Sequence, residues 1–296
     1  MSSLLQSPRT QRVILPLLGL LFLSGCSLSR KVAVGQMVPI LSNTKEAALE
    51  TSDLELVEAG LPANILLLDG LIRTNPTNRD LLAIGSFMQF GYALGFLEGR
   101  DLESASAYYR KGFEYGLSSL EGDRKFRGAA EKPLDVWQRA MKELGKKQVE
   151  AMAWTCANWG RWIQLNLSSP AAIAQQPRFE ALLNRLLEVD DEFEGGLPHV
   201  LRGVYDAMRP EMFGGQPDSA KVHFDKAFVL SERKNKLYLQ LYAESYCPRM
   251  LDEECFDATL EEVLREDPDE PPQVRLMNAM AVRRAHALLL RREELF

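Results

Sequence analysis

Residues 84–116 read IGSFMQFGYALGFLEGRDLESASAYYRKGFEYG, and this stretch decides the fold class. From Ile84 to Gly95, apolar and small residues recur every three or four positions, which places them on one face of a helix. From Leu102 to Gly116 the same spacing returns. Between the two halves, Gly99 is typical of a helix C-terminus and Asp101 of an N-cap. The stretch therefore predicts an antiparallel pair of helices with a tight connection.

The same helical pattern continues to both sides of this hairpin. Prolines punctuate the chain at the expected helix boundaries, for example Pro217 at the first turn of a helix and Pro268 after the end of another. No segment keeps the period of two that marks a β-strand over more than a few residues. We therefore expect an all-α domain over residues 45–296.

A second hairpin copies the first at an offset of about 115 residues. An alanine, an aromatic residue four positions on and a small residue three further on are typical of the second helix of a tetratricopeptide-like (TPR-like) hairpin. The two copies of this pattern are Ala105, Tyr109 and Gly112, and Ala220, Phe224 and Ala227. We predict stacked, degenerate TPR-like helical hairpins, an α-solenoid or compact superhelix, with two pseudo-repeats at about 61–120 and 177–235.

The N-terminal residues resemble a targeting signal. Arg9 and Arg12 precede a short apolar run that ends in small residues before Cys26, so residues 1–25 predict a secretory signal peptide. The run is too short for a membrane-spanning helix, which is the less favoured interpretation. Leu23 to Cys26 also resembles a bacterial lipobox, which predicts lipidation of Cys26 and a lipid-anchored tether over residues 26–44. An ordinary signal peptide with a nearby cysteine is the alternative.

Charge and motif content narrow the class of function. The 296-residue chain carries 41 acidic against 35 basic residues, a formal charge of −6, which argues against a nucleic-acid partner. It contains no His-Glu-x-x-His, nucleophile elbow, phosphate loop or dinucleotide motif. His199, His223 and His286 are far apart in sequence and are expected to be structural or surface residues. We expect no enzyme, no cofactor and no metal site.

Two further groups of residues are candidates for structural or binding roles. Cys247 and Cys255 could form a disulfide in an oxidising compartment, or stay as two reduced thiols. Three of the four tryptophans lie within one short segment that also holds two polar residues. This segment is interpreted either as core packing or as an aromatic lining that binds a ligand or partner. Its candidate binding residues are Trp154, Asn158, Trp159, Arg161 and Trp162.

Several stretches together resemble one known family. They are Leu61 to Asn64 with Asn75 to Asn78, Gly91 to Phe96, Trp154 to Ile163, Gly215 to Lys221 and the closing segment from Asn278 to Phe296. They are similar, in the same order, to the T component of tripartite ATP-independent periplasmic (TRAP) transporters, a TPR-like lipoprotein family. The resemblance implies a partnership with the periplasmic solute-binding receptor. It also implies homotrimers around a pore that helps a hydrophobic or organic-acid ligand reach that receptor.

The sequence thus predicts a lipid-anchored accessory subunit of a TRAP-type transporter that binds the receptor and assists solute uptake. The alternative is a TPR-like scaffold lipoprotein in envelope or outer-membrane assembly. Ser27 follows the lipidated cysteine, whereas an Asp there tends to hold bacterial lipoproteins at the inner membrane. We therefore expect a periplasmic location with an outer-membrane anchor favoured.

Overall fold

The computed structural model describes residues 30–209 and 215–296. Within these ranges the chain folds into helices joined by turns and contains no strand, which confirms the predicted all-α fold class. The predicted signal peptide and Cys26 lie outside the described residues. The division into two pseudo-repeats stays a prediction, although Ala105 and Ala220, its matching alanines, are both completely buried.

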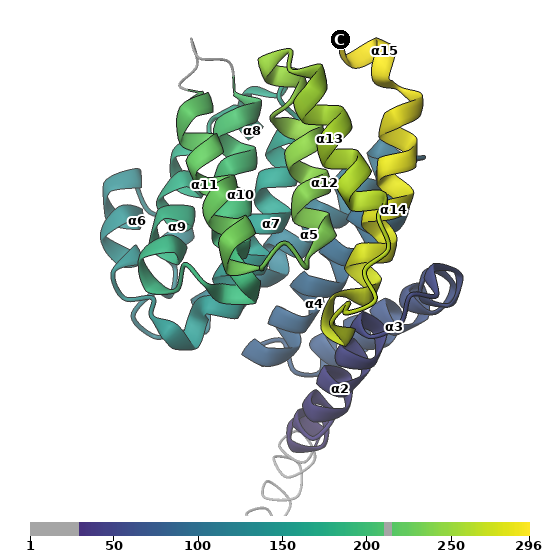
Figure 1. Cartoon of the computed structure of the whole chain (residues 1–296). Coiled ribbons are helices and arrows are strands. Elements are labelled where there is room, and N and C mark those ends of the chain that lie inside the picture. Colours follow the sequence, from purple (N-terminus) through teal and green to yellow (C-terminus); the bar gives the residue numbers. More distant parts are fainter. Residues whose placement is uncertain (1–29, 210–214) are drawn as a thin grey trace, which may run out of the picture.

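The helices run along the chain with short connections, several of them 3-10 turns (Figure 1). Their bounds are α2 Val38–Leu49, α3 Leu54–Thr74, α4 Arg79–Tyr92, the π-helical turn η1 Ala93–Leu97, α5 Leu102–Glu121, α6 Leu134–Met141, α7 Val149–Leu165, α8 Pro170–Ile173, α9 Gln176–Val189, α10 Phe193–Met208, α11 Pro217–Leu230, α12 Lys236–Ser245, α13 Glu253–Leu264, α14 Arg275–Leu290 and α15 Arg292–Leu295.

The deciding stretch forms the hairpin α4–η1–α5. Asp101 caps α5, because its side chain accepts hydrogen bonds from the backbone N–H and the hydroxyl of Ser104. The apolar face of α4 is buried, and the segment Arg79–Leu97 is long and apolar enough to cross a membrane by composition alone. Because 78% of its apolar window lies inside the protein, it is a core helix of the bundle.

Helix α7 is the centre of the bundle. It packs against α4, α5, α9 and α10, and every residue from Ala151 to Trp159 is buried. Small residues allow these close approaches: a Cβ at Gly112 of α5 would lie 2.2 Å from Asn158 Oδ1 of α7. Helix α7 is therefore covered by neighbours on all sides over most of its length, as expected of a helix that is apolar all round.

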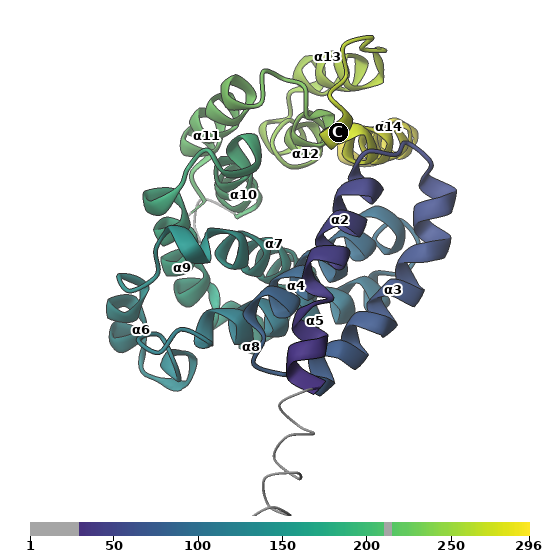
Figure 2. The ribbon, with the colours of Figure 1, turned by 90° about the horizontal axis from the view of Figure 1, so that it is seen from below.

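The C-terminal helices curve back onto the N-terminal ones. Helix α14 packs on α12 and α13 on one side and contacts α2 and α3 on the other (Figure 2). A glycine eases the approach to η1, since a Cβ at Gly95 would lie 2.7 Å from Met280 Cε of α14 and would displace the end of that side chain. The stacked hairpins thus form a compact superhelix whose two ends meet.

Candidate functional site

An apolar cavity of about 80 Å³ lies between α7, α9, α10 and α12. Helix α7 contributes small residues to its wall, among them Ala157 and Gly160, and α10 contributes Val200 and Val204. Leu167, just after α7, belongs to the same lining and is 46% exposed. We therefore take Leu167 as part of the rim of this cavity.

A larger cavity of about 350 Å³ lies next to it, between α4, α10, α12 and the segment that leads into α14. Four buried or nearly buried side chains line both cavities and thus form the partition between them. They are Phe90, Leu197, Leu237 and Tyr238. These four residues therefore belong to the walls of both spaces.

Two polar groups stand out in the mostly apolar wall of the larger cavity. The indole Nε1–H of Trp154 is buried and has no hydrogen-bond partner within the described ranges. A buried donor without a partner costs free energy, and Trp154 belongs to the lining of this cavity. Glu194 is also part of the wall, and burial raises the pKa of its carboxyl group. The wall therefore includes a residue with a buried, unpartnered indole N–H and a carboxyl group whose pKa is raised.

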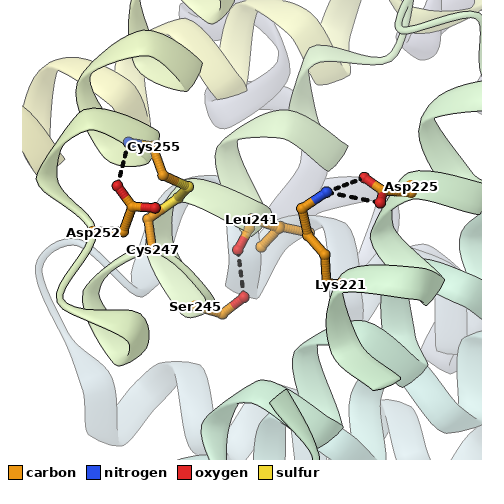
Figure 3. Close-up of a disulfide and its surroundings, with 7 residues drawn as sticks. All are labelled: Lys221, Asp225, Leu241, Ser245, Cys247, Asp252 and Cys255. Carbon is orange, nitrogen blue, oxygen red and sulfur yellow. Dashed lines mark hydrogen bonds and ion pairs between the residues drawn. A yellow bond between two sulfur atoms is a disulfide. The ribbon is translucent and has the colours of Figure 1, made fainter. Parts of the chain in front are cut away.

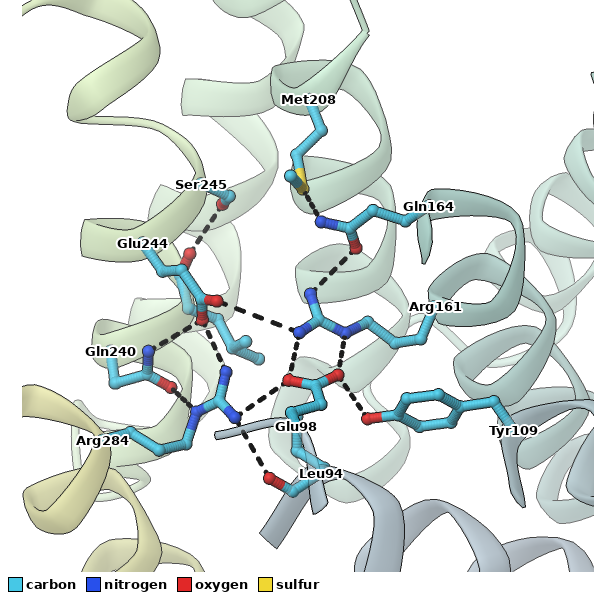
Figure 4. Close-up of polar contacts among 11 residues, drawn as sticks. Leu94, Glu98, Tyr109, Arg161, Gln164, Met208, Gln240, Glu244, Ser245 and Arg284 are labelled. Atoms are coloured by element: carbon cyan, nitrogen blue, oxygen red, sulfur yellow. Dashed lines mark hydrogen bonds and ion pairs between the residues drawn. The ribbon is translucent and has the colours of Figure 1, made fainter. Parts of the chain in front are cut away.

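A four-charge network, Glu98–Arg161–Glu244–Arg284, borders the smaller cavity (Figure 4). Arg161 binds Glu98 through two nitrogens, with 2.7 Å from its Nε to Glu98 Oε1. Arg284 joins Glu98 Oε2 at 2.9 Å and Glu244 Oε2 at 2.7 Å. These residues come from η1, α7, α12 and α14 and their neighbouring turns, so the network joins the two ends of the superhelix.

Electrostatics keep all four groups of this network charged. Burial alone raises the pKa of Glu98, but the guanidiniums of Arg161 and Arg284 outweigh it and lower that pKa. At Glu244 burial is likewise opposed by Arg284 and Arg161, and its pKa falls to about 2. The network is therefore two ion pairs with no net charge, and it contains no group positioned as a nucleophile or base.

The candidate binding residues divide between the cavities and the core. Trp154 lines the larger cavity and Arg161 the smaller one. The other three do not line either cavity. Asn158 is completely buried and donates to the backbone oxygens of Ser86 and Trp154.

The remaining two aromatic residues of the segment contribute to packing. Trp159 stacks on Phe113 with ring centroids 4.5 Å apart and donates from Nε1 to Gln175 Oε1. Trp162 is half-buried against the core. The core-packing interpretation thus describes Asn158, Trp159 and Trp162, while a ligand-binding role stays a prediction for Trp154 and Arg161.

Sequence reasoning missed Glu98, Glu244 and Arg284. A signal for two of them exists: Glu98 ends a long uncharged run after Asp80, and Arg284 interrupts the apolar pattern of the last long helix. A charged residue inside such a pattern is buried only when it is paired. The partners could not be chosen from sequence, because they lie on four separate segments.

Two of the three histidines meet in the structure although they are 24 residues apart in sequence. His199 Nδ1 of α10 lies 2.8 Å from His223 Nδ1 of α11, and His199 Nε2 lies 3.2 Å from Asp191 Oδ2. Burial, followed by the neighbouring His199, lowers the pKa of His223. Among the described residues, no group of three or more side chains is arranged to hold a metal ion.

A disulfide joins Cys247 and Cys255, whose Cα atoms are 5.7 Å apart (Figure 3). It links the end of α12 to the start of α13. Asp252, between the two cysteines, caps α13 by accepting from Cys255 N at 2.9 Å. The remaining described cysteine, Cys156, is a buried thiol whose pKa is raised by burial.

A comparison with known protein families finds a match over most of the chain. The model of a protein family described as TAtT, TRAP transporter T-component, matches residues 50–296. No curated protein matches the chain. The matched range covers the helices from α3 to α15 and includes both cavities except Leu49, together with the whole charge network.

Proposed function

This chain belongs to the family of TRAP transporter T-components, which are accessory subunits of transporters rather than a known enzyme family, and on that premise we propose that it conducts a small solute to a solute-binding receptor. The observation that carries the proposal is the pair of adjoining cavities. They share a wall of four apolar or aromatic side chains, Phe90, Leu197, Leu237 and Tyr238. A rotation of those side chains would join the two spaces.

The chemistry of the walls indicates the class of solute. The lining is chiefly aliphatic and aromatic, which favours an apolar body on the ligand. The unpartnered Nε1–H of Trp154 favours a hydrogen-bond acceptor at one end. We infer a small organic solute with an apolar part and a carbonyl or carboxyl group. Arg161 plays a supporting part, because its guanidinium is already held by Glu98 and Gln164.

We further propose that the receptor docks over the rim of the smaller cavity, around Leu167. An exposed apolar residue at a cavity mouth is suited to burial in an interface. The expected location is the periplasm, where a lipid on Cys26 would anchor the protein, with the outer membrane favoured. Homotrimers are part of the same proposal.

Docking is tested by capture of periplasmic proteins on the chain that begins at Ser27. We expect to recover a solute-binding receptor, and Leu167→Asp should weaken its recovery. Val229→Asp is the matched control, because Val229 is 72% exposed on α11 and lines neither cavity. Recovery of envelope-assembly proteins without a receptor would contradict the proposal and favour the scaffold alternative.

The solute path needs a separate test. Val204→Trp places a large ring in the smaller cavity, and Val222→Trp places the same ring on the exposed side of α11. Once the receptor is known, uptake of its radiolabelled ligand should fall with Val204→Trp while receptor capture is retained. Equal uptake by both variants, with thermal unfolding unchanged, would refute a path through this cavity.

A further inference from the structure

Helices α10 and α11 lie side by side, and two histidines meet between them (Figures 1 and 2). Cβ atoms at Gly196 and Gly203 of α10 would lie 3.1 and 2.8 Å from atoms of α11, so the two helices approach closely. His199 lies between these glycines on α10 and is 9% exposed. It contacts His223 of α11, and we call these two residues the histidine pair. The pair therefore belongs to a closely packed helix interface.

The distances decide where the protons of the neutral histidine pair lie. His199 Nδ1 is 2.8 Å from His223 Nδ1, and a hydrogen bond between two ring nitrogens needs a proton on one and a lone pair on the other. His199 Nε2 is 3.2 Å from Asp191 Oδ2, and a carboxylate accepts, so His199 carries its proton on Nε2. In the neutral pair His223 therefore donates from Nδ1 to His199.

This contact tolerates one added proton but not two. With one added proton, an imidazolium donates to a neutral imidazole, and the N–H···N bond is kept. With two, both Nδ1 atoms carry a proton and neither has a lone pair to accept the other. The ring centroids are only 5.0 Å apart, so the two positive charges also repel each other. The second proton therefore breaks the bond between α10 and α11.

The charges beside His223 are already paired with one another. Those that act on it, besides His199, are Asp206 and Arg202, both on α10. Arg202 Nε binds Asp206 Oδ2 at 2.9 Å, and Arg202 Nη1 lies 3.3 Å from Glu180 of α9. A carboxylate that is already held by a guanidinium offsets little of an added positive charge.

The other nearby ion pair lies on α11 itself, where Lys221 binds both oxygens of Asp225. Asp191, before the start of α10, is the carboxylate that contacts the histidine pair directly. It carries one negative charge and is 45% exposed. Asp191 can therefore balance the first added proton, whereas the second leaves the pair with an excess positive charge.

Helix α10 connects the histidine pair to the cavities. Val200, the residue after His199, lines the smaller cavity together with Leu201 and Val204 of the same helix. A change in how α10 packs on α11 is therefore a change in the support of this cavity wall.

We propose that the histidine pair is a pH-sensitive switch between α10 and α11, closed with no added proton or one and open with two, and that its opening moves the α10 wall of the smaller cavity. The second part rests on the solute path proposed above, and the first part does not. Burial, followed by the neighbouring His199, lowers the pKa of His223 in the closed state. Acid therefore favours the open state, and opening begins as the pH falls below the ordinary value of 6.5.

The switch is tested by NMR on the chain from Ser27, labelled with ¹⁵N, over about pH 8 to 4.5. At the highest pH we expect the His223 ring to carry its proton on Nδ1 and the His199 ring on Nε2. Protection of the α11 amides against hydrogen exchange should fall about tenfold below pH 6.5, which is the effect of one lost hydrogen bond. The α14 amides should keep their protection. Unchanged protection in α11, or an equal fall in α14, would overturn the switch.

Substitutions assign this response to the histidine pair. His223→Gln removes one titrating ring but keeps a donor and an acceptor, so α11 should stay protected at acid pH. His199→Gln should behave in the same way and provides a second variant if the first does not fold. His286→Gln is the matched control, because His286 is exposed on α14, and this variant should respond to pH as the wild type does. A full acid response in both pair variants would refute the assignment.

The coupling to the cavity has its own readout. The ¹³C methyl signals of Val200 and Val204 should shift with the same pH midpoint as the loss of protection in α11, while those of Leu288, buried on α14, should not. Opening of α11 without a shift at Val200 and Val204 would refute the coupling. Failure of the uptake test described above would contradict the solute path and leave the switch in place, so the two proposals can fail separately.

Discussion

Replacement of Glu98 by glutamine should be among the most destabilising single polar changes in this protein. Glu98 accepts from Tyr109 Oη at 2.5 Å, from two nitrogens of Arg161 and from Arg284 Nη1 at 2.9 Å. Its side chain is 6% exposed. Glu98→Gln leaves two buried guanidiniums opposite one carboxylate and turns an N–H donor toward them. Removal of one partner from a buried ion pair costs about 3–5 kcal/mol.

Urea unfolding followed by circular dichroism measures this loss. With a slope of about 3 kcal/mol per molar urea, the midpoint should fall by about 1–1.7 M. The control is Glu262→Gln. Glu262 also binds an arginine through both oxygens, with distances of 2.6 and 2.5 Å to Arg233, but the two side chains are 33% and 46% exposed. That exposed pair should contribute about 0–1 kcal/mol.

The comparison contrasts a buried glutamate that has two arginine partners with an exposed one that has a single arginine, and both include a bidentate arginine–glutamate pair. Equal losses of unfolding free energy for Glu98→Gln and Glu262→Gln, or a loss at Glu98 below about 1 kcal/mol, would refute the reasoning that the buried network contributes more to stability than an exposed ion pair.

Acid titration of stability gives a second readout of the same network. The pKa values of Glu98 and Glu244 lie below their ordinary value of 4.5, that of Glu244 at about 2. The unfolded chain therefore binds more protons as the pH falls below 4.5. The stabilisation is complete above pH 4.5 and is lost between about pH 4.5 and 2. The Glu98→Gln variant should lose less stability over this range than the wild type.

Three other predictions concern separate parts of the fold. The pKa of His223 is below its ordinary value of 6.5, so the free energy of unfolding should fall as the pH decreases below 6.5. Urea titrations at pH 7.5 and 5.5 measure this fall, and it should be smaller in the His223→Gln variant. Gly112→Ala should destabilise the protein by about 1–3 kcal/mol, because its Cβ would lie 2.2 Å from Asn158 Oδ1. Gly70→Ala, which has open space around its Cβ, should stabilise it by about 0.5–1 kcal/mol. A stabilised Gly112→Ala variant would contradict the packing described. Reduction of the disulfide should cost about 2.5 kcal/mol by loss of loop closure, and an unchanged thermal unfolding curve under reductant would show that the bond contributes nothing.

Helix class and local connections were predictable because their signals are local. The spacing of apolar residues in 84–116 predicted the hairpin, and Asp101 predicted the cap that the structure places at α5. Nothing local predicts that α14 returns to η1. That closure depends on side chains far apart in sequence, such as Glu98 and Arg284, and on the close approach that Gly95 permits.

The tryptophan segment shows a different limit of sequence reasoning. Helical spacing tells which residues share a face, but α7 is buried over most of its surface, so no face of it could be assigned to solvent or ligand from the pattern. Trp154 reaches a cavity wall while Trp159 packs in the core. Only the positions of α5, α9 and α10 around α7 decide between the two outcomes.

The charge network also sets an order of events during synthesis. Glu98 and Arg161 are 63 residues apart, whereas Glu98 and Arg284 are 186 apart. As the chain grows from its N-terminus, the first pair can therefore form long before the last helix exists. Until Arg284 emerges, Glu244 lacks its closest cationic partner, because Arg161 lies at 3.9 Å and Arg284 at 2.7 Å. A chain that ends before α14 would have its first hairpins folded, but α12 would lack the helix that packs on it. Proteolysis of such truncated chains should therefore begin at α12.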